Sequence, residues 1–146
     1  MILLLVVATA AAGFFAGAAI YINAVEHPAR MSGGVALALK EFGPSYRRAT
    51  VMQVSLAVTG LLSGVLYGWE SGDRTVLVAA LLLGAVIPFT LVAIMPTNRR
   101  LLAAGLENNE VAARALLTRW NRLHGVRSLL SAMAFVGLLS RLAGLD

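Results

Sequence analysis

The chain contains no cysteine and few charged residues. Of its 146 residues none is cysteine and only 13% are Asp, Glu, Lys or Arg, whereas 59% are hydrophobic. The absence of cysteine excludes disulfide bonds, thiolate metal sites and dithiol redox chemistry. The scarcity of charge, together with a mean hydropathy of +0.81, argues against a water-soluble core and indicates a membrane protein.

Four apolar runs with almost no charge organise the sequence. They cover residues 2–25, 51–69, 76–95 and 128–145, and each approaches or exceeds the roughly 20 residues that span a bilayer. We therefore expect an all-α membrane protein, a four-transmembrane-helix bundle with amphipathic cytoplasmic connections, in which residues 1–146 form a single domain. The first run is interpreted as a spanning helix, not a signal peptide, because no basic segment follows Met1 and the run is too long.

Lys and Arg are distributed unevenly between the connections. Ten of the twelve lie in residues 26–50 and 96–127. The positive-inside rule places these two long loops in the cytoplasm and both termini outside. We expect an integral protein of a bacterial inner membrane, with the lipid bilayer and a hydrophobic small molecule as partners. The net charge of +5 follows from this asymmetry beside anionic headgroups, so no nucleic acid is expected as a partner.

The connections and the apolar runs carry further local signals. Residues 34–42 are predicted to form a short amphipathic helix lying in the membrane interface. After Asn109 a helical pattern begins that no Pro or Gly interrupts before Gly125, so the fourth helix is expected to extend into the cytoplasm as one rod. Pro88 is expected to kink the third span.

Glycines recur at every fourth position in two of the runs. Such spacing lets helix backbones approach closely where lipid supplies no hydrophobic drive for association. Packing inside the bundle is the preferred interpretation, and a homodimer through the glycine-rich helix faces is the alternative. The residues are Gly13, Gly17, Gly60, Gly64 and Gly68.

Polar side chains gather at one end of all four runs. An antiparallel bundle brings these ends to the same side of the membrane. Asn23 and His27 are four residues apart, and His124 is three from both Asn121 and Arg127, so each set shares a helix face. The sequence therefore predicts a polar pocket just inside the cytoplasmic surface. Its predicted residues are Asn23, Glu26, His27, Gln53, Thr97, Asn98, Asn121, His124 and Arg127.

Three segments also carry a family resemblance. They are Phe15–Ala19 running into Glu26–Arg30, then Pro96–Leu101, then Trp120–Ser128. Together they resemble, over essentially the whole chain, the anthrone-oxygenase-like family of small four-helix membrane proteins, many of unassigned function. The resemblance implies oxygen-dependent oxidation of a hydrophobic aromatic molecule, as in the conversion of an anthrone to an anthraquinone. It implies no conventional flavin or haem cofactor.

The reaction that the resemblance implies assigns a role to each polar residue. A base must remove an acidic C–H proton, and His27 or His124 is suited to this because imidazole titrates near neutral pH. Glu26 either orients a histidine or acts as the base. Asn98 and Arg127 are predicted to hold the developing enolate oxygen. The predicted substrate-binding residues are Trp120, which offers a flat apolar wall, and Asn23, Gln53 and Asn121.

Two other functions stay open at the level of sequence. Glu26, His27 and His124 contain the ligands of a two-histidine, one-carboxylate metal site, provided that Pro28 ends the first helix; a haem between the two histidines is a further variant. The second open function is that of a non-catalytic module, which binds a quinone-like lipid or a partner helix. An apolar cavity reaching both histidines favours an oxidoreductase. A site sealed by Arg127 packed against Glu26 favours the module.

Overall fold

The computed structural model describes residues 1–145, which form four long helical rods. Each rod is long and apolar enough to cross a membrane, so the predicted all-α four-helix architecture is confirmed. The elements are α1 (Ile2–Tyr21), η1 (Ile22–Glu26), α2 (His27–Ser32), α3 (Val35–Ser71), α4 (Arg74–Phe89), η2 (Thr90–Ile94), α5 (Met95–Leu101), η3 (Leu106–Asn108) and α6 (Glu110–Leu142). The first rod is α1–η1–α2 and the third is α4–η2–α5, each uninterrupted along its length.

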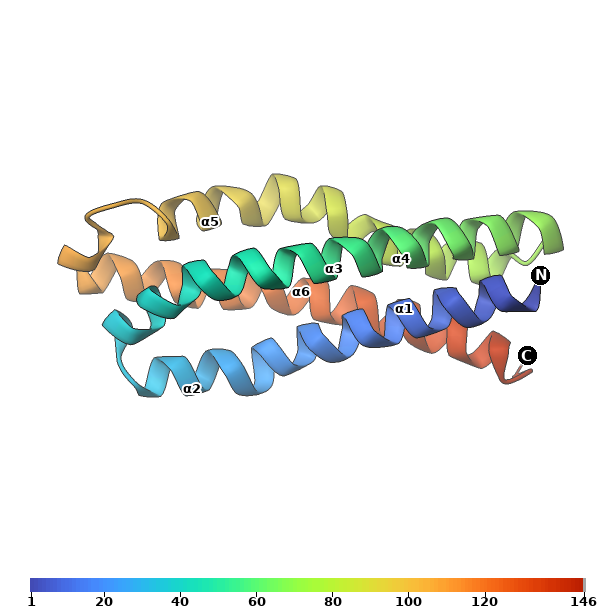
Figure 1. The fold of residues 1–146 in the computed structure, drawn as a ribbon, viewed down its shortest axis with the longest axis horizontal. Helices are drawn as coiled ribbons and strands as arrows, with labels where there is room; N and C mark the ends of the chain where they lie inside the picture. The colour runs from blue at the N-terminus through green and yellow to red at the C-terminus, as the bar shows by residue number, and fades with distance from the viewer. Residues whose placement is uncertain (146) are drawn as a thin grey trace.

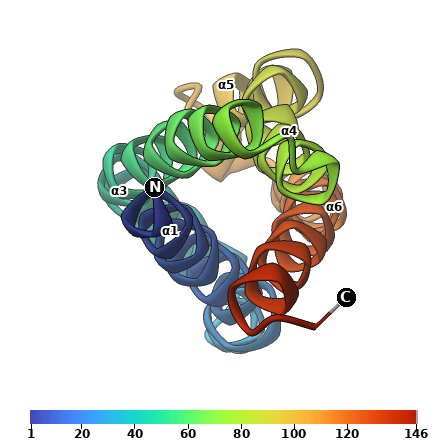
Figure 2. The ribbon, with the colours of Figure 1, turned by 90° about the vertical axis from the view of Figure 1, so that its right-hand side faces the viewer.

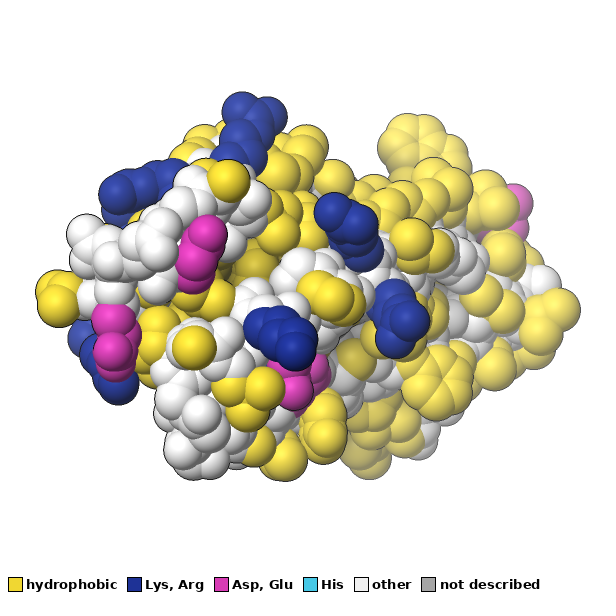
Figure 3. All heavy atoms as spheres, turned by 60° about the vertical axis from the view of Figure 1, so that its left-hand side comes forward, with side chains coloured by type: hydrophobic (Ala, Val, Ile, Leu, Met, Phe, Trp, Pro, Cys, Tyr) yellow, Lys and Arg dark blue, Asp and Glu magenta, His cyan; other side chains and the backbone are white. Residues whose placement is uncertain are grey.

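The rods pack as an antiparallel square. α1 lies beside α3 and α6, and α4 completes the square by packing on the same two helices (Figures 1 and 2). Both termini lie at the end of the bundle that holds the α3–α4 turn, and the other two connections lie at the opposite end (Figure 1). Lys and Arg side chains gather toward that opposite end, whereas the far part of the surface is mainly hydrophobic (Figure 3).

The helices extend well beyond the predicted spans, and the long first loop does not exist. Only Gly33 and Gly34 separate α2 from α3, where Gly34 adopts a φ of 96° that favours glycine. The predicted interfacial helix at residues 34–42 is wrong, because these residues form the first turns of α3. The predicted long fourth helix is confirmed: α6 begins after Asn109, whose side chain accepts a hydrogen bond from the Ala112 N–H and caps it.

A π-helical turn precedes a proline in two of the rods. η1 covers the residues six to two places before Pro28, and η2 stands in the same relation to Pro96. A proline ring clashes with the carbonyl four residues before it, and a widened turn relieves that clash without ending the helix. The helix also continues through Pro88, and α-helical geometry gives way only at Thr90.

The glycines of α3 are used inside the bundle. A Cβ placed on Gly64 would lie 2.7 Å from the Ala80 Cβ of α4, and one on Gly60 would meet Leu83 at 2.5 Å. α3 and α4 therefore approach each other more closely than any larger residue at Gly64 would permit. Gly17 differs, since a Cβ there would have no neighbour within 4 Å. The predicted use of glycines for bundle packing is confirmed for α3, and the homodimer stays a prediction.

Gly64→Ala is expected to destabilise the bundle because Ala80 presents a Cβ that cannot rotate away. Overpacking of this kind costs about 1–3 kcal/mol, less the roughly 1 kcal/mol that alanine gains over glycine in a helix. Unfolding by SDS titration, followed by circular dichroism, measures the difference. Gly17→Ala is the matched control and is expected to equal or exceed the native stability. Equal stability of the two variants would contradict the close contact between α3 and α4.

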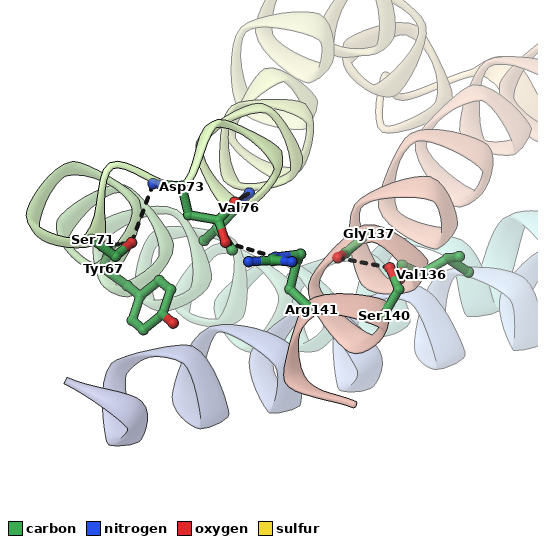
Figure 4. A network of polar contacts seen from close by, with 8 residues as sticks. All are labelled: Tyr67, Ser71, Asp73, Val76, Val136, Gly137, Ser140 and Arg141. Carbon is green, nitrogen blue, oxygen red and sulfur yellow. Dashed lines mark hydrogen bonds and ion pairs between the residues drawn. The ribbon is translucent and has the colours of Figure 1, made fainter. Parts of the chain in front are cut away.

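An ion pair ties the α3–α4 turn to the end of α6. The Asp73 carboxylate accepts a hydrogen bond from the Val76 N–H, which caps α4, and it pairs with Arg141 Nε at 2.7 Å (Figure 4). Burial acts to raise the pKa of Asp73, but the hydrogen bonds from Val76, Arg141 and Thr75 and the Arg141 charge outweigh it and lower the pKa. An ion pair, in addition to apolar packing, therefore joins α6 to the α3–α4 turn at this end of the bundle.

Candidate active site

Buried polar side chains lie between two apolar clusters of the bundle interior. One cluster, built around Leu5, Phe15 and Leu83, fills the end near the termini, and the other, built around Phe42 and Leu117, fills the opposite end. Gln53 is the middle residue of α3. At 1.5 Å per residue it lies about 27 Å from either end of that helix. The predicted pocket therefore lies away from the ends of α3 and α6, because these helices continue past Gln53 and His124, whereas Asn98 is three residues from the end of α5.

A cavity of about 130 Å³ occupies this region, where α3 faces η2 and α5. Apolar side chains make up most of its wall. Val54 and Leu91 line it and are also 49% and 59% exposed, so the wall reaches the outer surface of the bundle. The lining residues are Phe15, Ile22, Arg30, Phe42, Ser45, Tyr46, Ala49, Thr50, Gln53, Val54, Ala57, Val86, Ile87, Thr90, Leu91, Ile94, Met95, Asn98, Trp120, His124 and Arg127.

Three residues that line the cavity each have one buried polar side-chain atom without a hydrogen-bond partner. These atoms are Nε2 of Gln53, Nε of Arg127 and Oδ1 of Asn98. The rest of the Arg127 side chain is held in place: Nη2 donates to Gln53 Oε1 at 2.7 Å, and the guanidinium carbon lies 5.4 Å from the centre of the Phe15 ring. Buried donors and acceptors are nearly always paired in native proteins. Two donor atoms and one acceptor atom therefore lack the partners that buried polar groups usually have, which makes their residues the candidates for holding a polar group of a ligand.

His124 is the predicted base that reaches the cavity. It is buried on α6, and its Nδ1 contacts Asn23 Oδ1 at 2.9 Å. Its other ring nitrogen, Nε2, has no hydrogen-bond partner among residues 1–145. A histidine with one nitrogen held and the other free toward a cavity has the arrangement of a general base.

Trp120 contacts both histidines, but only one of them lines the cavity. Its ring centre lies 4.8 Å from that of His124 and 5.8 Å from that of His27, and Phe42 packs edge-on against it at 5.4 Å. Trp120 is only 6% exposed and lines the cavity, as expected for an aromatic wall and not for a residue of the membrane interface. His27 is buried on the Trp120 ring but is not a lining residue. The cavity thus reaches one histidine of the predicted pair.

Glu26 belongs to an ion-pair network beside the cavity. It forms an ion pair with Arg30 and accepts a hydrogen bond from Ser45 at 2.9 Å, while Arg30 donates to Ser45 at 2.6 Å and lies 3.7 Å from Glu41. Arg127 bonds Gln53 instead of Glu26, so the sealed arrangement in which these two residues pack against each other is not found. Arg30 and Ser45 line the cavity.

The arrangement does not favour the metal site formed by Glu26, His27 and His124. That site required the first helix to end at Pro28, but the helix continues to Ser32. Within the described part of the chain, no three His, Asp or Glu side chains are grouped so that they could hold a metal ion.

The predicted site residues divide into four groups. Gln53, Asn98, Trp120, His124 and Arg127 line the cavity. Asn23 and Asn121, predicted to contact substrate, are not lining residues and bond to each other behind His124, with Asn23 Nδ2 donating to Asn121 Oδ1 at 2.7 Å. Glu26 and His27 lie outside the lining as well. Thr97 is buried without being a lining residue.

Sequence reasoning missed several polar or polarisable lining residues. Arg30 was counted only as a charge of the first loop, and Ser45 and Tyr46 were assigned to that loop. Ser45 and Tyr46 directly follow Gly43 and Pro44, a pair typical of a turn, so no clear sign in the sequence indicated that one helix continues through them. The missed residues are Arg30, Ser45, Tyr46, Thr50, Thr90 and Met95.

Comparison with known proteins agrees with the resemblance seen in the sequence. The family model of anthrone oxygenase matches residues 42–137. An anthrone oxygenase of Claviceps purpurea (strain 20.1) is 29% identical over an alignment of 157 positions, which covers 92% of this chain and 88% of the relative. The anthrone oxygenase tpcL of Aspergillus fumigatus is 37% identical over 111 residues, which cover 67% of this chain and 66% of the relative.

These two relatives are fungal, and the bacterial location of this chain stays a prediction. No solved structure matches the chain. The matched segment begins at Phe42 and runs through α3, α4, η2 and α5 into α6, and so contains most of the cavity wall, including Gln53, Asn98 and His124. The chain belongs to the anthrone oxygenase family.

Proposed function

We propose that the protein is a membrane oxidoreductase that removes a proton from a weakly acidic C–H group of a hydrophobic aromatic molecule and oxidises that carbon with molecular oxygen. The observation that carries this proposal is that three residues lining the cavity together with His124 each have a buried polar atom without a partner: Gln53 Nε2, Arg127 Nε and Asn98 Oδ1. The names of the relatives, both anthrone oxygenases, support the reaction class. An anthrone fits the description because its CH2 group is flanked by two aromatic rings and conjugated through them to a carbonyl.

The cavity residues have distinct roles in the proposed reaction. Nε2 of His124 accepts the C–H proton, and the negative charge spreads to the carbonyl oxygen of the substrate. Arg127 Nε and Gln53 Nε2 then donate to that oxygen, a task that fixed donors perform well at a site shielded from water. Asn98 Oδ1 accepts from a hydroxyl group of the substrate. Trp120 and Phe42 supply apolar contact for an aromatic ring.

The overall conversion balances without a further reductant. The carbanion carbon adds to oxygen to give a peroxide, which takes up the proton held by His124 and then loses water. The net change is that CH2 and O2 become C=O and H2O, with one oxygen atom in the product and the other in water. Oxygen receives four electrons, two from each C–H bond that is lost.

The size of the cavity limits how much of the substrate is enclosed. Its volume of about 130 Å³ is close to that of an apolar cavity of roughly 150 Å³ that binds benzene. One ring therefore fits inside, and a polycyclic substrate must extend between α3 and η2. Val54 and Leu91 line the cavity and are exposed at this position. A substrate dissolved in the bilayer would enter here without crossing water.

Oxygen consumption by the protein in nanodiscs tests the proposed function. Anthrone is the probe, and protein-free nanodiscs give the background rate of its spontaneous oxidation. We expect one O2 consumed per anthraquinone formed, with no hydrogen peroxide released, and slower turnover when the CH2 group carries deuterium. A rate equal to that of protein-free nanodiscs contradicts catalysis, and saturable anthrone binding without turnover would instead favour the binding module. Loss of activity with a chelator, restored by added metal, would favour the metal-dependent alternative.

A further inference from the structure

The amide of Asn23 is held in one orientation by a backbone carbonyl. Asn23 Nδ2 lies 2.9 Å from the main-chain oxygen of Asn121 and 2.7 Å from its side-chain oxygen. A carbonyl oxygen can only accept, so the group that faces it must be the NH2 of the Asn23 amide. The reverse orientation would place two oxygen acceptors against each other. The Asn23 oxygen, Oδ1, therefore points away from Asn121.

That oxygen determines which nitrogen of His124 carries the proton. Asn23 Oδ1 accepts from the Ser128 hydroxyl at 2.6 Å and lies 2.9 Å from His124 Nδ1. An amide oxygen has no proton to give, so Nδ1 of His124 must be the donor in this contact. Neutral imidazole carries only one ring proton, and Nε2 is then left with its lone pair free.

We infer that Asn23 is a positioning residue: it holds neutral His124 as the Nδ1–H tautomer, so that the lone pair of Nε2 is available in the cavity. This inference rests on the proposed function, in which Nε2 is the base. Asn23 does not line the cavity and therefore acts through His124. It lies in η1, the π-helical turn that precedes Pro28. A turn of this kind re-aims side chains and recurs at functional sites.

Nitrogen NMR of the full chain in nanodiscs tests the tautomer directly. With 15N-labelled histidine only two residues give signals, because the chain has two histidines, and His27→Gln identifies those of His124. In the neutral ring we expect a protonated Nδ1 and an unprotonated Nε2. An Nε2–H tautomer in the native protein overturns the inference.

Substitution of Asn23 separates positioning from a purely structural role. Asn23→Leu removes the acceptor and is expected to abolish the Nδ1–H preference and to lower kcat about 10- to 100-fold, the usual effect of losing a residue that orients a ligand or base. KM is expected to change less than twofold because Asn23 is not a lining residue. If Asn23→Leu does not fold, Asn23→Asp is the second variant: it loses the NH2 that bonds Asn121 but keeps an acceptor toward His124, so Nδ1 is expected to stay protonated. Unchanged kcat in an Asn23→Leu protein that has lost the tautomer overturns the inference.

Ser128→Ala is the matched control. It removes the other donor to the same Asn23 oxygen and leaves the contact to His124 in place, so both the tautomer and kcat are expected to stay within about twofold of native. Loss of the tautomer in Ser128→Ala would assign its control to the serine and overturn the role of Asn23. The NMR result does not depend on turnover. A native Nδ1–H tautomer in a protein that oxidises no anthrone supports the tautomer assignment and contradicts only the proposed function.

Discussion

His124→Asn is expected to lower kcat for anthrone oxidation by about 10²- to 10⁴-fold, the contribution of a positioned general base. The asparagine side-chain NH2 can replace Nδ1 as the donor to Asn23 Oδ1, so the contact behind the site is retained. No atom of the asparagine takes the place of Nε2, which has no hydrogen-bond partner among residues 1–145. The expected result is a protein that folds and inserts normally but lacks the atom that accepts the C–H proton. Initial rates of oxygen uptake in nanodiscs measure the change.

Two variants on the native background show whether the effect belongs to His124 alone. Arg119 is exposed on the same helix, and Arg119→Ala is expected to leave kcat within about twofold of native. His27 contacts Trp120 but does not line the cavity, so His27→Gln is expected to reduce kcat by less than tenfold. If His124→Asn retained native turnover, another group would have to be the base. Equal losses in both histidine variants would contradict the assignment of the base to His124 alone.

Arg127→Lys is expected to lower kcat about 10²- to 10³-fold, the typical cost of removing one donor from an oxyanion site. Lysine keeps the positive charge, and its ammonium group can reach Gln53 Oε1 in place of Nη2. It has no second donor at the position of Nε, the atom that is enclosed and unpaired in the cavity wall. The expected loss therefore reports on a directed donor and not on net charge. The deuterium isotope effect is expected to increase as proton removal becomes slower.

Arg122→Lys is the control for this substitution. Arg122 lies on α6 five residues earlier, and its side chain is exposed, so the same chemical change there is expected to leave kcat unaltered. Native activity in Arg127→Lys would show that Nε does not hold the substrate oxygen and would assign Arg127 to bundle packing through Gln53 and Phe15. SDS titration distinguishes loss of folding from loss of the donor: the variant is expected to stay folded, with a destabilisation of about 0.5–3 kcal/mol, the usual range for a single substitution.

Much of the fold was readable from the sequence because hydrophobic runs measure helix length directly. The four runs correspond to the four rods, and the uninterrupted pattern after Asn109 correctly predicted the full length of α6. The predicted spans were too short where a helix continues beyond its apolar run into charged residues. α3 begins at Val35, yet residues 40–48 carry Lys40, Glu41, Arg47 and Arg48. These charges and the Gly43-Pro44 pair favour a connection, yet α3 continues through Pro44 without a break.

The sequence predicted which residues lie near one another at the site, but not which of them contact each other or line the cavity. Topology alone brings Gln53, Asn98, His124 and Arg127 to neighbouring levels of an antiparallel bundle, and all four line the cavity. The spacing of residues along one helix does not reveal which histidine ring lines the cavity. His27 and Asn23 share a helix with Glu26, yet the π-helical turn η1 rotates them relative to an ideal helix, and the three residues have separate partners. No periodicity in the sequence predicts that π-helical turn.

The sequence by itself determined the number of spans, the end of the bundle at which basic residues collect, and the family, because these depend on composition and on motifs local to the chain. Tertiary structure alone decided that one histidine reaches the cavity and that Asn23 stands behind it. It also decided that Arg127 bonds Gln53 and not Glu26. The physical reason is that these outcomes depend on contacts between residues up to 101 positions apart. The π-helical turns before Pro28 and Pro96 also change the direction of nearby side chains, and local sequence patterns do not reveal them.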